Sequence, residues 1–136
     1  MTYRFTARAA RTEIAPDGYF TEAALAEGED GSGFTLMFMA GEEDSDGQEV
    51  ALGTDTHCLV TARQGTEHGC VHEAVLAGNV LRISLNPEAL EDLRLNDSEI
   101  EAVIETPAED IVMFREVLAQ VLAYGRADAV PTRVAV

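Results

Sequence analysis

The sequence contains no lysine, no tryptophan and only two cysteines in 136 residues. It also has no uninterrupted apolar run near the roughly 18 residues that a membrane-spanning helix needs. Two cysteines, Cys58 and Cys70, are too few to form a disulfide framework in a chain of this length, so we expect both to stay free thiols in a reducing compartment. The start of the chain lacks the charged segment and apolar stretch of an export signal. We therefore expect a cytoplasmic protein with no membrane association.

Negative charge is the dominant feature of the composition. The chain has 25 Asp and Glu residues against nine basic residues, all of them arginine, which gives a formal net charge of −16. The electrostatic field of a protein with this net charge repels nucleic acids and anionic membranes and attracts basic surfaces. The charge therefore favours either solubility alone or the binding of a basic protein.

The length fits a single domain with one ordinary hydrophobic core. We expect one domain over residues 1–125 and a C-terminal tail over 126–136 that is flexible or forms a fringe strand. The sequence predicts an extended segment over Tyr3–Ile14, a second strand over Tyr19–Ala26, and a central strand over Phe34–Met39. Because Phe34–Met39 is apolar at nearly every position, we expect this strand to be buried on both faces.

The rest of the chain continues with strands and ends in a helix. His57–Ala62 and His68–Ala77 flank a turn at Gln64-Gly65 and predict a hairpin. Asn79–Leu85 predicts a strand with Leu81, Ile83 and Leu85 on one face. Asn86-Pro87-Glu88 is typical of the start of a short helix, which we expect to run through Leu93.

Ser98–Glu105 alternates as a strand, with Ile100, Ala102 and Ile104 on its inward face. After Pro107, apolar residues recur at helical spacing until Gly125: Ile111, Phe114, Leu118, Val121 and Leu122. The pattern as a whole predicts an α+β fold, a mostly antiparallel sheet with a C-terminal amphipathic helix packed on one face. An open edge at the first or last strand is also a possible homodimer contact.

The predicted hairpin holds the chain's strongest candidate metal ligands. A turn at Gln64-Gly65 pairs His57 with His72, Leu59 with Cys70 and Thr61 with His68. This register places all three histidines and Cys70 on one face, where His57, Cys70 and His72 could approach one ion. His68 and His72 are about 13 Å apart at roughly 3.3 Å per residue and cannot both bind one ion. The spacing matches no established zinc signature, so ordinary half-buried sheet side chains are the alternative interpretation. In this register Cys58 and Cys70 face opposite sides, which argues against a disulfide.

Motifs of catalysis and cofactor binding are missing from the sequence. There is no phosphate-binding glycine-rich loop, no nucleophile elbow, no His-Glu-x-x-His and no calcium loop. Gly41–Gly53 is strongly acidic with little to bury, and it predicts a surface loop. We therefore expect no enzymatic activity and no cofactor. The alternative is a small metal- or ligand-binding domain that uses the face of His57, Cys70 and His72.

The middle of the chain resembles the tenth immunity-protein family of bacterial polymorphic toxin systems. The resemblance is carried by the stretch from Asp46 to Val60, DGQEVALGTDTHCLV, followed by His68-Gly69-Cys70-Val71, and it extends from about Phe34 to Leu122. This chain departs from the family pattern where His68-Gly69-Cys70 replaces an aromatic residue and a glycine pair. The resemblance implies a small α+β domain that binds a cognate toxin and does no chemistry itself.

Charge and loop position, taken together with this resemblance, indicate which residues contact the partner. If the toxin is a nuclease, its groove is basic, and an acidic loop can occupy it as a phosphate mimic. The exposed face of the hairpin with its histidines is a second candidate surface. We expect the partner-binding residues to be Glu42, Glu43, Asp44, Asp46, Glu49 and Asp55.

Overall fold

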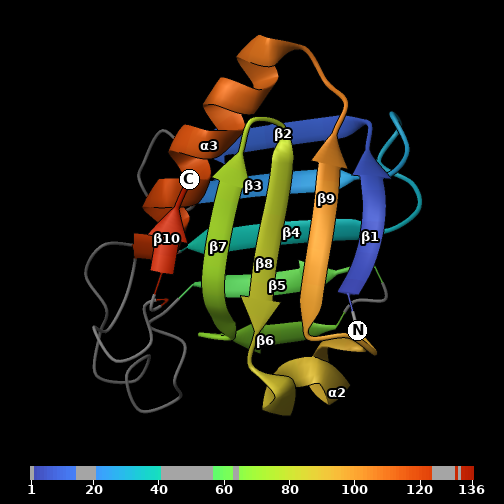
Figure 1. Cartoon of the computed structure of the whole chain (residues 1–136), viewed down its shortest axis with the longest axis vertical. Coiled ribbons are helices and arrows are strands. Elements are labelled where there is room, and N and C mark those ends of the chain that lie inside the picture. The colour runs from blue at the N-terminus through green and yellow to red at the C-terminus, as the bar shows by residue number, and fades with distance from the viewer. Residues whose placement is uncertain (1, 15–20, 41–56, 63–64, 124–130, 132) are drawn as a thin grey trace.

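The structure is a sandwich of two β-sheets with one long helix beside the nearer sheet (Figure 1). The computed structural model describes residues 2–14, 21–40, 57–62, 65–123, 131 and 133–136. Strands of the two sheets run across each other (Figure 1). The α+β class is confirmed, with two sheets. The strands are β1 (Thr2–Ala7), β2 (Ala9–Ile14), β3 (Thr21–Ala26), β4 (Thr35–Ala40), β5 (Cys58–Thr61), β6 (Thr66–His68), β7 (Val71–Ala77), β8 (Val80–Leu85), β9 (Glu99–Ile104) and β10 (Arg133–Ala135).

Each sheet contains five strands within the described residues. The front sheet, nearer the viewer in Figure 1, has the order β1-β9-β8-β7-β10, and the back sheet has the order β2-β3-β4-β5-β6. Neighbouring strands are antiparallel except for two parallel pairs, β1 with β9 and β10 with β7. Both parallel pairs join a terminal strand to the front sheet, so residues near the two ends of the chain complete that sheet.

The first extended segment is two strands, and the prediction of one segment over Tyr3–Ile14 is wrong. The chain changes sheets at Arg8, so that β1 pairs with β9 and β2 pairs with β3. The Arg8 N–H donates to the Ala26 carbonyl at 2.9 Å, which begins the pairing in the back sheet. Apolar and polar residues alternate across the junction without a turn signal, and the sequence therefore gives no sign of the switch.

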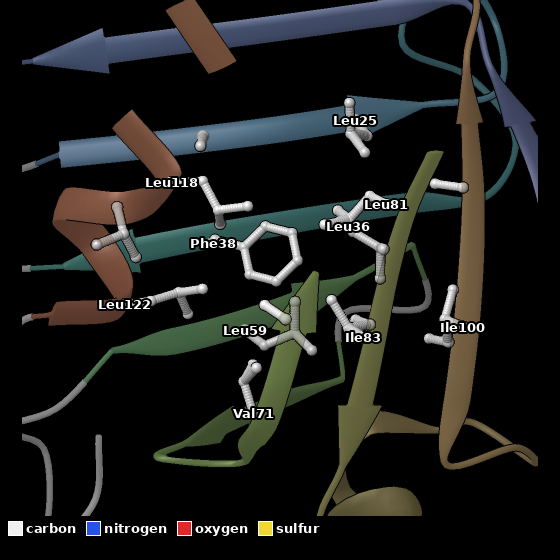
Figure 2. Packing of buried hydrophobic residues seen from close by; sticks show 14 of the residues in the cluster. Leu25, Leu36, Phe38, Leu59, Val71, Leu81, Ile83, Ile100, Leu118 and Leu122 are labelled. Carbon is white, nitrogen blue, oxygen red and sulfur yellow. The ribbon is translucent and has the colours of Figure 1, made fainter. Parts of the chain in front are cut away.

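The hydrophobic core lies between the sheets, as Figure 2 shows. Leu36 and Phe38 of β4, Leu81 of β8 and Leu118 of the long helix all belong to this buried cluster (Figure 2). The predicted inward faces of two front-sheet strands are confirmed. Their buried residues are Leu81, Ile83 and Leu85 on β8 and Ile100, Ala102 and Ile104 on β9.

β4 is central in the back sheet, as predicted, but it is fully buried on one face only. Leu36, Phe38 and Ala40 are buried, whereas Met37 and Met39 are partly exposed. The prediction of burial on both faces is therefore wrong. The front sheet and the long helix cover one face of the back sheet, and no described element packs on the other.

The helices are close to their predicted positions. The Asn86 side chain accepts the Glu88 N–H at 3.2 Å and caps a short helical turn, η1 (Pro87–Ala89), which continues as α2 (Leu90–Leu93). The long helix α3 (Ala108–Ala123) packs on β2, β3 and β4. Within the described residues, no helix combines the length and hydropathy that crossing a membrane would require. The buried residues of α3 are Phe114, Val117, Leu118, Val121 and Leu122.

Candidate functional site

The hairpin that would assemble the candidate metal ligands forms in a different register. β5 pairs with β6, with Cys58 opposite His68 and Leu59 opposite Glu67. The predicted pairs of His57 with His72, Leu59 with Cys70 and Thr61 with His68 are therefore wrong. β6 ends at His68, and after Gly69 and Cys70 the chain enters the front sheet as β7. The common face that we expected for His57, Cys70 and His72 is not formed by this pairing.

Gly69 explains why the strand cannot continue. Its φ of 64° is a left-handed conformation that glycine adopts without strain. The Gly69 N–H donates to the His57 carbonyl at 2.9 Å, and the Asn86 N–H donates to the Cys70 carbonyl at 2.8 Å. These two bonds hold the crossing from one sheet to the other. Within the described residues no group of three or more His, Cys, Asp and Glu side chains could hold a metal ion.

His57 has a structural role at this crossing. Its side chain is fully buried, and Nε2 accepts the Val71 N–H at 3.1 Å. Burial, followed by the nearby His68, lowers the pKa of His57 to about 4. Since an accepting nitrogen carries no proton, the ring is neutral at pH 7 and joins the end of the back sheet to the first residue of β7.

The two cysteines are free thiols, as predicted. Burial, followed by the charge of Glu67, raises the pKa of Cys70 to about 12 and also raises the pKa of Cys58. Metal ligation and nucleophilic attack both require the thiolate, which is disfavoured at these two positions.

We expect zinc to leave the stability of the protein unchanged. One equivalent of Zn²⁺ at pH 7 should not shift the melting temperature, because Nε2 of His57 is already an acceptor and the Cys70 thiol is protonated. Differential scanning fluorimetry with and without zinc measures this. A zinc-dependent rise that disappears in the exposed-site variant His72→Ala would contradict the expectation and support a metal-binding function.

The six acidic residues that we expect to contact a partner all lie outside the described residues. Their segment, 41–56, joins β4 to β5, which are antiparallel neighbours with Met39 opposite Cys58. Ala40 and His57, the described residues on either side of the segment, therefore lie at the same end of the back sheet. The assignment of Glu42, Glu43, Asp44, Asp46, Glu49 and Asp55 to a binding surface stays a prediction.

An aromatic cleft that the sequence did not predict opens where the two sheets separate. Its volume is 370 Å³, and its walls come from β1, the segment before β4, the end of β5 and the turn after α2. Figure 1 shows the start of β1 near α2 at this end of the sandwich. Tyr3 is 38% exposed, and its ring centroid lies 4.6 Å from that of Phe34, which in turn lies 4.8 Å from that of Phe5.

Charged groups line the same cleft. Glu27 and Asp97 are partly buried, and Arg94 and Asn96 are exposed. Oε1 of Glu27 accepts the Phe34 N–H at 2.6 Å, so this carboxylate is fixed next to the aromatic wall. Arg94 has a left-handed φ of 58°, which turns the chain away from α2 at the cleft. The residues are distant in sequence, so only the folded chain reveals the site.

The outer face of the front sheet carries the ion pairs found among the described residues. Glu101 lies between Arg4 and Arg82 on neighbouring strands, at 2.5 Å and 3.3 Å. Glu101 is only 7% exposed, whereas both arginine side chains are mostly exposed. The pairing links β1, β9 and β8 side by side and uses two of the nine basic residues to neutralise one buried carboxylate.

A family model described as Immunity protein 10 matches residues 6–112, which is most of the chain. No curated protein and no solved structure matches. The matched range begins in β1, contains β2 to β9, and ends in the first turns of α3. It includes the crossing between sheets at Gly69 and every residue that lines the cleft except Tyr3. The chain therefore belongs to the immunity protein 10 family.

Proposed function

We propose that this protein binds a cognate bacterial toxin domain in the cytoplasm and neutralises it without doing chemistry itself. The match to the immunity protein 10 family over residues 6–112 is the observation that carries the proposal. Immunity proteins act by forming a complex, and this mode of action fits a chain in which both thiols have raised pKa values and the central histidine is a buried backbone acceptor.

The charge of the chain supports a basic partner. A net charge of −16 attracts a cationic surface over long range and raises the rate of encounter to roughly 10⁸ to 10⁹ M⁻¹ s⁻¹ at low salt. A nuclease toxin has a basic groove for its substrate, and the carboxylates of residues 42–55 match that groove in charge. The proposal is thus that the acidic segment covers the toxin's substrate-binding groove.

Growth protection tests both the function and the surface. Cells would express the toxin-like protein encoded beside this gene, alone, with the intact chain, or with a variant in which five acids are replaced by Gln or Asn. We expect the intact chain to restore growth and the variant to lose most of that protection. The five replaced acids are Glu42, Glu43, Asp44, Asp46 and Glu49.

A matched control variant distinguishes the effect of losing these five acids from the effect of lowering the total negative charge. It replaces five exposed acids elsewhere, so that the net charge changes by the same amount, and we expect it to protect fully. If the intact chain gives no protection, the proposed function is wrong. If the loop variant protects as well as the intact chain, the function stands and the surface is wrong. The control acids are Glu29, Glu88, Glu91, Glu105 and Glu116.

A further inference from the structure

We propose that the aromatic cleft at the open end of the sandwich binds one arginine side chain of the partner protein. The identity of the partner rests on the proposed function, whereas the chemistry of the cleft rests on the described residues alone. The cleft would act as an anchor point separate in sequence from the acidic segment. Its occupant follows from its aromatic wall, its charges and its volume.

The aromatic wall suits a planar cation. Tyr3 is the most exposed of the three packed aromatic residues Tyr3, Phe34 and Phe5, with 38% of the residue exposed, and it lines the cleft. A guanidinium group stacks on such a ring and is attracted by its electron-rich face. Tyr3 also lies on an edge strand, so a partner can approach it without displacing another strand.

The acids of the cleft supply acceptors beside that ring. Glu27 is held in place through its bond to the Phe34 N–H, and Asp97 is partly buried in the turn before β9. Neither carboxylate is within ion-pair distance of Arg94, since the ion pairs among the described residues involve only Glu101 with Arg4 and Arg82. An entering guanidinium therefore finds two carboxylates available.

Arg94 provides a test of whether the cleft prefers a cation or an anion. It lines the same cleft and is exposed, so it repels a bound cation and would attract a bound anion. Removing its charge should strengthen the binding of arginine and weaken the binding of a carboxylate. The volume of 370 Å³ lies within the range of small-ligand sites and is sufficient for one long side chain.

Nuclear magnetic resonance titration of the full chain tests the proposal without the toxin. The probe is Nα-acetyl-arginine methylamide, compared with the corresponding norleucine and glutamate derivatives. We expect saturable shifts of backbone amides around Tyr3, Phe34 and Asp97 with the arginine probe, with a roughly millimolar Kd as befits a small fragment. The norleucine and glutamate probes should give no saturable shifts there.

Three variants and a control variant test which groups of the cleft bind the arginine side chain. Asp97→Asn and Tyr3→Leu should each weaken arginine binding by about two- to fivefold, as expected for one partly exposed charge pair or ring contact. Arg94→Gln should strengthen it by a similar factor. Glu116→Gln removes the same charge as Asp97→Asn from an exposed position on α3 and should leave the Kd unchanged. Each variant's amide spectrum establishes that it is folded.

Other outcomes overturn the proposal. Arginine shifts spread over all acidic surfaces, equal binding of norleucine, or weaker binding by Arg94→Gln would each show that the cleft does not select a guanidinium. The result is independent of the growth assay. Protection without arginine binding rejects only the cleft, and arginine binding without protection rejects only the immunity function.

Discussion

Replacing Gly65 with alanine is expected to lower the free energy of unfolding by about 3 kcal/mol, near the upper end of the cost of overpacking a buried position. An added Cβ would lie 2.2 Å from the Leu93 carbonyl oxygen and 2.3 Å from its carbon. Both atoms belong to the backbone at the end of α2, so no side-chain rotation relieves the clash. Chemical denaturation of the two proteins measures the difference.

The effect should be large because the same contact joins two elements. The Thr61 hydroxyl donates to the Leu93 carbonyl at 2.7 Å, and the Thr61 N–H donates to the Gly65 carbonyl at 2.9 Å. A displaced Leu93 therefore disturbs the β5–β6 turn. It also moves Arg94, the next residue, and with it one wall of the aromatic cleft.

Gly78→Ala is the comparison for this prediction. Gly78 has a φ of 61°, but an added Cβ there would meet no atom within 4 Å. Its replacement should therefore cost only the strain of a left-handed residue, about 1 kcal/mol. If Gly65→Ala costs no more than Gly78→Ala, the close approach of Gly65 to α2 is not a constraint on the fold.

Acidification is expected to destabilise the protein through His57. The folded-state pKa of about 4 lies below the ordinary value of 6.5. The unfolded chain therefore binds this proton first, and the contribution of His57 is fully present above pH 6.5 and is lost as the pH falls toward 4. The loss amounts to about 3 kcal/mol between pH 7 and pH 4, because one pKa unit corresponds to roughly 1.4 kcal/mol.

A variant without a titrating ring isolates this effect from the many carboxylates. His57→Gln keeps a side-chain acceptor for the Val71 N–H but has no proton to gain. Urea unfolding at pH 7, 6, 5 and 4 should show the variant less stable at pH 7 and the gap to the wild type shrinking as the pH falls. His72→Gln, at an exposed position, should follow the wild type. A gap that stays constant over this range would contradict a buried neutral His57.

Much of the secondary structure was predictable because the determining signals are local. The helical spacing from Ile111 to Leu122 and the preceding Pro107 predicted α3, and Asn86 with Pro87 predicted the start of the short helix. Alternation predicted the inward faces of β8 and β9. These patterns reflect which side chains leave water, and they are complete within one element.

The sequence did not indicate which strands pair with each other or in which register. Two predictions, the single strand over Tyr3–Ile14 and the hairpin register, were wrong for this reason. Apolar and polar residues alternate from Tyr3 to Ala9 without interruption, although the chain changes sheets at Arg8, so the pattern does not mark the change. The hairpin register was wrong because the Thr61 N–H bonds the Gly65 carbonyl at the turn, which places Cys58, and not Thr61, opposite His68. Gly69 then turns the chain into the front sheet. The candidate metal face depended on the predicted register.

The sequence by itself determined the acidic character of the protein, its α+β class and its family, since composition, periodicity and the stretch from Asp46 to Val60 are properties of the chain alone. Tertiary structure alone decided the partition of strands between two sheets, the burial of His57 and the aromatic cleft. Each of these depends on residues far apart in sequence, such as Tyr3 and Asp97, being brought together by the packing of a common core, and local patterns carry no information about that pairing.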